Sequence, residues 1–155
     1  MDKVKIMKIG ELPVKDKAEH EGYAYTRRDF VRRDEGEQMM VTVYEIPPLM
    51  AAYPYHYHAD IEEVFYIISG HGLLRTPDGE REVSAGELIY FPADPGGAHK
   101  LTNLSETEKL IYIDFDTTAD PNIALYPDSG KVGVWGKGIN KLFRMADEVG
   151  YYDGE

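Results

Sequence analysis

The chain has 155 residues, enough for one domain with a proper hydrophobic core. Its net charge of -11 argues against nucleic acid and anionic membrane surfaces as partners, and its lack of cysteine excludes disulfides and thiolate chemistry. The first residues lack an apolar run of signal-peptide length, and no stretch is long and apolar enough to span a membrane, so we expect a cytoplasmic protein.

Residues 1–22 are expected to form an N-terminal arm, in which a short alternating apolar piece precedes a charged run. Residues 23–31 mix aromatic and charged side chains, and a turn is expected over residues 32–36. Arg27-Arg28 and Arg32-Arg33 are candidates to hold an anionic ligand. In so acidic a chain, however, arginines more often pair with Asp and Glu across strands, and we prefer that interpretation.

The middle of the chain reads as a series of short strands separated by turns. Residues 38–46 form an apolar strand that stops at two prolines, residues 73–76 and 80–83 flank a Pro-Asp-Gly hairpin turn, and residues 109–115 form another apolar strand. Strands with turn signals every ~8–12 residues are typical of an all-β sandwich or barrel. We therefore predict an all-β fold.

The C-terminal part, residues 116–155, has a different character. Residues 116–138 predict an extended strap with two short strands. Residues 140–149 carry apolar side chains at a roughly helical spacing, which predicts a short helix at the end of the strap.

The strongest chemical signal lies between Tyr53 and Gly72. His56 and His58 are two residues apart, so on a strand their side chains project from the same face. Two imidazoles side by side suit a divalent metal ion. Taken alone, the pair favours metal only weakly, because histidines beside tyrosines are also common on solvated surfaces.

A carboxylate at the entry of the next strand extends this signal. Glu62 and Glu63 both precede the apolar run Val64–Ile68. Alternation places Glu63 on the same face as Phe65 and Ile67, where core side chains point, and it leaves Glu62 on the opposite face. Glu63 is therefore the candidate ligand, and Glu62 is expected to be solvated.

A third histidine comes from a second strand pair. Residues 86–92 predict a glycine turn, a strand and a proline stop, residues 93–98 predict a loop, and His99 begins another strand. Three histidines and one carboxylate would make a four-ligand site for a first-row transition metal.

These residues resemble the two sequence motifs of the cupin family. The first motif is matched by His56-x-His58, then Glu63 and, six residues further on, Gly70, although Met50 stands where the pattern has its leading glycine. The second is matched by Gly86 through Pro92 and by Gly96 through His99 to Asn103, with a loop two residues longer than the pattern between Pro92 and Gly96. The spacing to Gly70 also selects Glu63 over Glu62.

The resemblance implies a double-stranded β-helix, a small jelly-roll-like barrel over residues 23–115, with the arm and the strap outside it. It implies that His56, His58, Glu63 and His99 bind a divalent Fe, Mn, Ni, Co or Zn ion. Six-coordinate metal would keep two neighbouring positions open for water, O₂ or a small oxygenated ligand. Asn103 is expected to be structural, and His71 to be a surface or turn residue.

The strand after Glu63 is apolar on both faces. Val64, Tyr66 and Ile68 need cover on the face that does not line the barrel. Cupins often pair through sheet faces, so we expect a homodimer, with the arm or the strap as the alternative cover.

Three functional hypotheses remain. The first is a metal-dependent oxygenase, isomerase or decarboxylase acting on a small molecule such as a hydroxy acid or a sugar. The second is a binding module for metal and a small molecule, without turnover. The third is a structural dimer with a vestigial site, which the complete ligand set opposes because buried unpaired polar groups cost stability. No general base can be assigned from the sequence.

Overall fold

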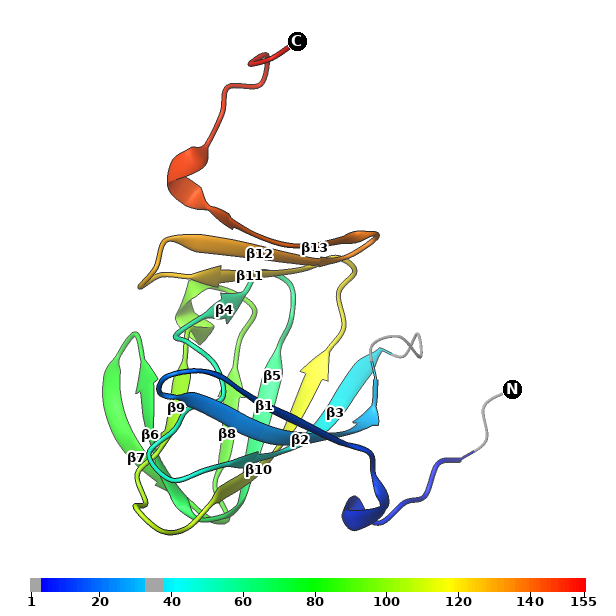
Figure 1. Ribbon diagram of the computed structural model, residues 1–155, viewed down its shortest axis with the longest axis vertical. Coiled ribbons are helices and arrows are strands. Elements are labelled where there is room, and N and C mark those ends of the chain that lie inside the picture. Colours follow the sequence, from blue (N-terminus) through cyan, green and yellow to red (C-terminus); the bar gives the residue numbers. More distant parts are fainter. Residues whose placement is uncertain (1–3, 33–37) are drawn as a thin grey trace.

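A computed structural model of the chain describes residues 4–32 and 38–155 and has an all-β architecture (Figure 1). The strands are β1 (Val14–His20), β2 (Tyr23–Val31), β3 (Met39–Ile46), β4 (Tyr57–His58), β5 (Glu63–Ser69), β6 (His71–Thr76), β7 (Gly79–Ser84), β8 (Leu88–Phe91), β9 (Lys100–Asn103), β10 (Leu110–Thr117), β11 (Asn122–Tyr126), β12 (Lys131–Gly136) and β13 (Ile139–Arg144). The expected all-β class is therefore confirmed.

Helical structure in the described ranges is limited to short 3₁₀ turns: η1 (Ile9–Glu11), η3 (Pro95–Gly97) and η4 (Met145–Asp147). Within residues 4–32 and 38–155, no helix has the length and apolar character needed to cross a membrane. The turn expected over residues 32–36 falls almost wholly outside the described residues.

The strands form three sheets. A six-stranded sheet has the order β1-β2-β3-β10-β5-β8, a three-stranded sheet has the order β7-β6-β9, and a four-stranded sheet has the order β13-β12-β11-β4. The first two make up the body of the barrel, and β12 and β13 run across one of its ends (Figure 1). All named strand pairs are antiparallel, and half of them join strands that are consecutive in the chain.

The core fills the barrel from the inner faces of both body sheets. Strand β5 shows the alternation: Glu63, Phe65 and Ile67 are buried, while Tyr66 and Ile68 are exposed. The remaining core side chains share this inward orientation and include Tyr25, Tyr44, Ile46, Leu74, Val83, Phe91, Leu101, Leu110 and Tyr112. Burial of each large apolar side chain contributes about 1.5–3 kcal/mol to folding, so the register of β5 is strongly determined.

Gly70 makes the sharp turn from β5 to β6 possible. Its φ of 86° lies in the left-handed region. A Cβ there would also lie 2.7 Å from the carbonyl oxygen of Lys109. A larger residue is therefore excluded by both conformation and space.

The C-terminal strap differs from the expectation at its end. Residues 139–144 form strand β13, paired along its length with β12, and only η4 follows, so the helix expected over residues 140–149 is wrong. The physical reason is the neighbouring strand, whose backbone groups satisfy those of residues 139–144. The strap is anchored near the histidine pair, because Ala124 of β11 pairs with His58 of β4.

The arm extends the barrel sheet. Strand β1 pairs with β2 at the edge of the six-stranded sheet, where Lys15 lies opposite Arg27. Neither the arm nor the strap covers the outer face of β5 and β8 in the described part of the chain. There Tyr66 is 38% exposed, Ile68 37% and Leu88 70%.

Candidate metal centre

Two backbone segments bring the three histidines together. His56 and His99 lie opposite each other in an isolated β-bridge, with His56 N–H donating to His99 O at 3.1 Å and His99 N–H donating to His56 O at 2.9 Å. Their ring centroids are 4.9 Å apart, and those of His56 and His58 are 5.1 Å apart. The bridge therefore brings His99 of the second motif beside the histidine pair of the first motif.

The longer loop before His99 folds into the turn η3. Asp94 caps this turn by accepting a hydrogen bond from Gly96 N at 2.6 Å. Gly97 is buried against the loop, and a Cβ on it would lie 2.0 Å from the carbonyl oxygen of Pro92. The loop that is two residues longer than the motif thus forms a compact turn, and this turn leads directly to His99.

Each of the three imidazoles is oriented by its Nδ1 atom, which contacts an oxygen acceptor. The three contacts are His56 Nδ1 to Pro54 O at 2.8 Å, His58 Nδ1 to Asn122 Oδ1 at 2.8 Å, and His99 Nδ1 to Gly97 O at 2.9 Å. An oxygen acceptor requires the proton on Nδ1, which leaves the Nε2 lone pair free. This is the way in which metal-binding histidines are commonly held.

Glu63 faces the free imidazole nitrogens. Its carboxylate oxygens lie 3.7 Å from His58 Nε2 and 3.5 Å from His99 Nε2, and its residue is only 6% exposed. Ligand atoms of His56, His58 and Glu63 all lie within 4.8 Å of one another. Atoms bound to one ion at about 2.1 Å are separated by roughly 3 to 4.2 Å, so these residues fit a metal.

Glu62 points to the opposite side of β5. It is exposed, and its carboxylate accepts a hydrogen bond from the hydroxyl of Tyr90, which lies on the outer face of the sheet. The structure thus separates the two glutamates as alternation predicted, with Glu63 among the histidines and Glu62 in solvent.

Burial keeps His56 and His99 neutral. Desolvation, with the neighbouring His58, lowers the pKa of His56 to about 4. Desolvation and the nearby His56 hold the pKa of His99 well below its ordinary value. Neutral imidazole is the form that binds a metal, so these two histidines need not release a proton first.

Two further carboxylates, which the sequence analysis did not identify, lie close to the candidate ligand Glu63. Asp114 and Asp116 lie on β10, where Asp116 is paired with Glu63 of the neighbouring β5. Ligand atoms of Glu63, Asp114 and Asp116 also lie within 4.8 Å of one another. The available signal was alternation, since both aspartates share a face with Tyr112, which is buried.

Ionising Glu63, Asp114 and Asp116 together costs free energy, because the three carboxylates are close to one another and shielded from water. Desolvation, together with the charge of Asp116, raises the pKa of Glu63 and of Asp114 well above their ordinary values. Asp114 Oδ1 and Asp116 Oδ1 are buried and have no hydrogen-bond partner among the residues that the structure describes. A bound cation would compensate such a concentration of buried negative charge.

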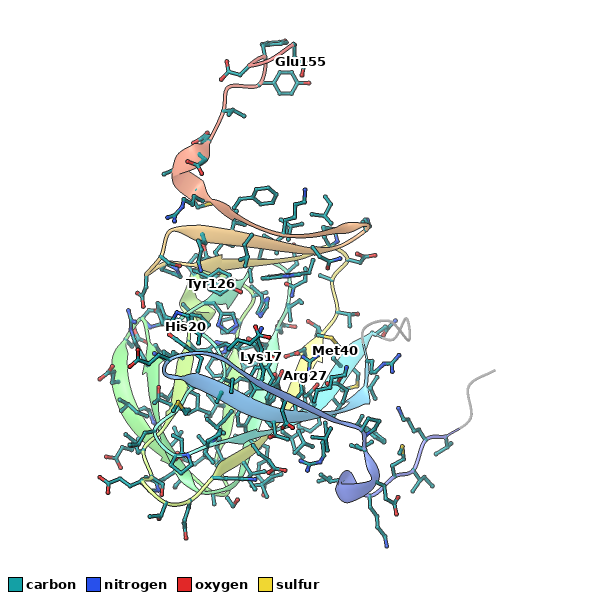
Figure 2. All side chains as sticks on the ribbon, viewed as in Figure 1. Lys17, His20, Arg27, Met40, Tyr126 and Glu155 are labelled. Carbon is teal, nitrogen blue, oxygen red and sulfur yellow. The ribbon has the colours of Figure 1, made fainter. Side chains whose placement is uncertain are left out.

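The four predicted ligands and the two aspartates lie in one pocket. Its volume is about 1280 Å³, and it extends from the barrel interior past β1 and β2 to the strap. Tyr126 of β11, labelled in Figure 2, stacks on His56 with ring centroids 5.8 Å apart and bounds this pocket. A small molecule can therefore reach the histidines.

The two other singled-out residues lie elsewhere. Asn103 is buried and structural, as expected: its Nδ2 donates to the carbonyl oxygens of Ile46, Pro47 and Glu108 at 2.8–3.1 Å, tying the end of β9 to neighbouring loops. His71 is exposed at the start of β6 and does not line the pocket.

Comparisons with known proteins agree with this architecture. A family model described as "Cupin domain" matches residues 42–116, which include all four predicted ligands. An uncharacterised protein of Methanocaldococcus jannaschii is 36% identical over 56 residues, or 36% of this chain and 43% of that protein. The match thus spans less than half of that relative's length.

Solved structures show the same fold over nearly the whole chain. One, from Acidithiobacillus ferrooxidans and described as a candidate sugar phosphate isomerase, has a TM-score of 0.79 and 24% identity over 92% of this chain and 91% of its own. Another, described as a sugar phosphate isomerase from Silicibacter pomeroyi, has a TM-score of 0.80 and 16% identity over 96% of this chain and 98% of its own. At these identities the likeness establishes the fold alone.

Proposed function

The chain is a member of the cupin superfamily, and we propose that it is a metal-dependent enzyme that moves a proton on a small oxygenated substrate, such as a hydroxy acid or a sugar. The metal would be a divalent first-row ion held by His56, His58, Glu63 and His99. This is an isomerase-type activity, and it narrows the range of metal-dependent reactions that the sequence leaves open.

One observation carries the proposal: the carboxylates of Asp114 and Asp116 lie beside the candidate ligands in an open pocket. A metal supplies Lewis-acid polarisation of a substrate oxygen, which makes a neighbouring carbon-bound proton more acidic. The chain itself must then supply a group that accepts this proton. A carboxylate next to the ligands, facing the pocket, has the right chemistry and position for that role.

Asp116 is the better candidate for the proton acceptor. It is only partly buried, whereas Asp114 is 6% exposed and packs deeper along β10. Asp116 also lines the pocket directly opposite Glu63 in the strand register. We assign Asp114 the supporting role of holding the position and charge of Asp116.

The fold neighbours are consistent with this reaction class. Two of the solved structures are described as sugar phosphate isomerases, one of them as a candidate, and aldose–ketose isomerisation is a proton transfer next to a carbonyl group. Their low identity to this chain leaves the pocket geometry as the main support.

The test is exchange of a substrate proton with solvent. Metal-loaded protein is incubated in D₂O with a panel of hydroxy acids, sugars and their phosphate esters, with and without O₂, and deuterium incorporation is followed by NMR. We expect exchange at the carbon next to the carbonyl or hydroxyl group, independent of O₂. Asp116→Asn should reduce it about 100-fold or more, the usual contribution of a general base, without changing the metal content.

Asp60→Asn is the matched control, because Asp60 is exposed and does not line the pocket. Turnover that requires O₂ without exchange would refute the proposal in favour of an oxygenase. Binding of metal and ligand with neither exchange nor turnover would refute it in favour of a non-catalytic binding module.

A further inference from the structure

We propose that the pocket wall formed by β1 and β2 is a binding subsite for a phosphate monoester group carried by the substrate. Its cationic residues are Lys15, Lys17 and Arg27, which we call the cationic wall. This inference rests on the proposed function, because it specifies which hydroxy acids or sugars the site accepts. It assigns a role to the N-terminal arm, which contributes two of the three cations.

Strand register places the three cations on one face. Lys15 is paired with Arg27, and Lys17 is paired with Tyr25 on the neighbouring strand. Residues opposite each other in a sheet project from the same face, as do residues two apart on one strand. All four side chains line the pocket that contains the histidines. Figure 2 labels Lys17 and Arg27 on this strand pair, with Tyr126 on the strap side of the pocket.

The neighbouring arginine shows that this orientation is specific. Arg28 points to the other face of β2 and forms an ion pair with Glu45, so it is used in a cross-strand contact. Arg27 instead faces the pocket and contacts Asp29 at 3.5 Å. The sequence predicted that both arginines form ion pairs across strands. Arg28 does so, whereas Arg27 has an ion-pair contact and also faces the pocket.

Arg27 is held in place by the barrel interior. Its side chain is 33% exposed, and Arg27 lies opposite Tyr44 of β3 in the strand register. The Tyr44 hydroxyl is in turn 2.9 Å from that of Tyr53, and its ring stacks on Tyr112. A guanidinium fixed in this way loses little freedom on binding, and its planar fork matches two oxygens of a phosphate.

Charge on the wall matches a dianion better than a monoanion. Lys15 contacts Asp29 at 2.7 Å, so this carboxylate offsets one of the three cations and leaves an excess of two positive charges. Lys17 also approaches Glu19 at 3.8 Å, but both side chains are more than half exposed, so solvent screens that pair strongly. The chain as a whole carries a net charge of -11, so the net positive charge of the cationic wall is opposite in sign to that of the protein.

The two ends of the pocket therefore differ in electrostatic character. The barrel end carries Glu63, Asp114 and Asp116 beside the imidazoles, and the arm side carries the cationic wall. A substrate with a phosphate at one end and hydroxyl or carbonyl oxygens at the other would be oriented by this difference. Its phosphate would face Arg27 and the two lysines, and its oxygenated carbons would face the metal ligands.

The test uses inorganic phosphate as the probe and does not depend on turnover. Binding of phosphate to the metal-loaded full-length protein is measured by calorimetry for the wild type and for Lys17→Gln, Arg27→Gln and the double variant. Each substitution should weaken binding, Arg27→Gln by about tenfold or more, because a charge-assisted hydrogen bond is lost. Acetate, a monoanion, should bind the wild type much more weakly than phosphate.

Matched controls are Lys141→Gln and Arg81→Gln, which remove the same charges at exposed positions outside the pocket. Both should bind phosphate as the wild type does. The proposal fails if the wild type does not bind phosphate, or if the double variant binds it equally well, as it would if phosphate occupied only the metal. Metal content and proton exchange measured on the same samples test the proposed function separately.

Discussion

Replacing Glu63 with glutamine should strongly weaken metal binding, whereas the same change at Glu62 should not. Glu63 is the only anion among the four candidate ligands, and its oxygens lie 3.5 and 3.7 Å from two imidazole Nε2 atoms. Loss of an outer hydrogen-bonding partner alone costs roughly 10- to 100-fold in metal affinity. Loss of the anionic ligand itself should therefore cost about 100-fold or more.

Glu62→Gln is the matched control, one residue away and identical in chemistry. It removes an exposed carboxylate that accepts a hydrogen bond from Tyr90 on the outer face. Exposed interactions of this kind contribute about 0–1 kcal/mol, so affinity should change by no more than about fivefold.

The assay is titration of chelator-treated protein with Zn²⁺ or Mn²⁺ in competition with a chromophoric chelator. Melting curves of the metal-free variants check that both are folded. If Glu62→Gln loses the metal and Glu63→Gln retains it, the register of β5 is wrong by one residue. Every inward and outward assignment on that strand would then be reversed.

Two further predictions concern stability and assembly. Burial and neighbouring charge raise the pKa values of Glu63 and Asp114, so the metal-free native state keeps protons that the unfolded chain releases. Native His56 is already neutral, and histidines of the unfolded chain are largely deprotonated above about pH 7.5. The melting temperature of chelated protein should therefore fall as pH rises above about 7.5, and added metal should reverse this fall. A melting temperature that rises over the same pH range, or that metal leaves unchanged, would contradict it. We also propose a homodimer through the exposed outer face of β5 and β8, so sedimentation should show a dimer at micromolar concentration that Ile68→Lys or Leu88→Lys converts to monomer, and a monomeric wild type would rule this out.

The sequence was most informative where a short-range pattern met a strong physical constraint. Alternation in β5 predicted the burial of Glu63, Phe65 and Ile67, because a one-residue slip would expose the whole apolar face. The two cupin-like motifs predicted that His56, His58 and His99 lie together, and the structure places them near Glu63. The all-β barrel and the cupin relationship were likewise predictable from these patterns.

Features that depend on a distant strand were harder to predict. Residues 139–144 form a strand because β12 pairs with them, and their apolar spacing alone resembled a helix. Asp114 and Asp116 belong to the pocket because β10 lies between β3 and β5, a neighbourhood that the sequence does not show. The same holds for the cationic wall, whose proposed role depends on pairing between β1 of the arm and β2.

The central claim is that His56, His58, Glu63 and His99 bind one divalent transition-metal ion. The most direct measurement is elemental analysis of protein purified without chelator and then equilibrated with Fe, Mn, Ni, Co or Zn, for the wild type and for His56→Ala with His99→Ala. We predict about one ion per chain in the wild type and none in the double variant, since two of four ligands are then missing. A wild type that binds no metal, or a folded double variant that binds as much as the wild type, would contradict the claim.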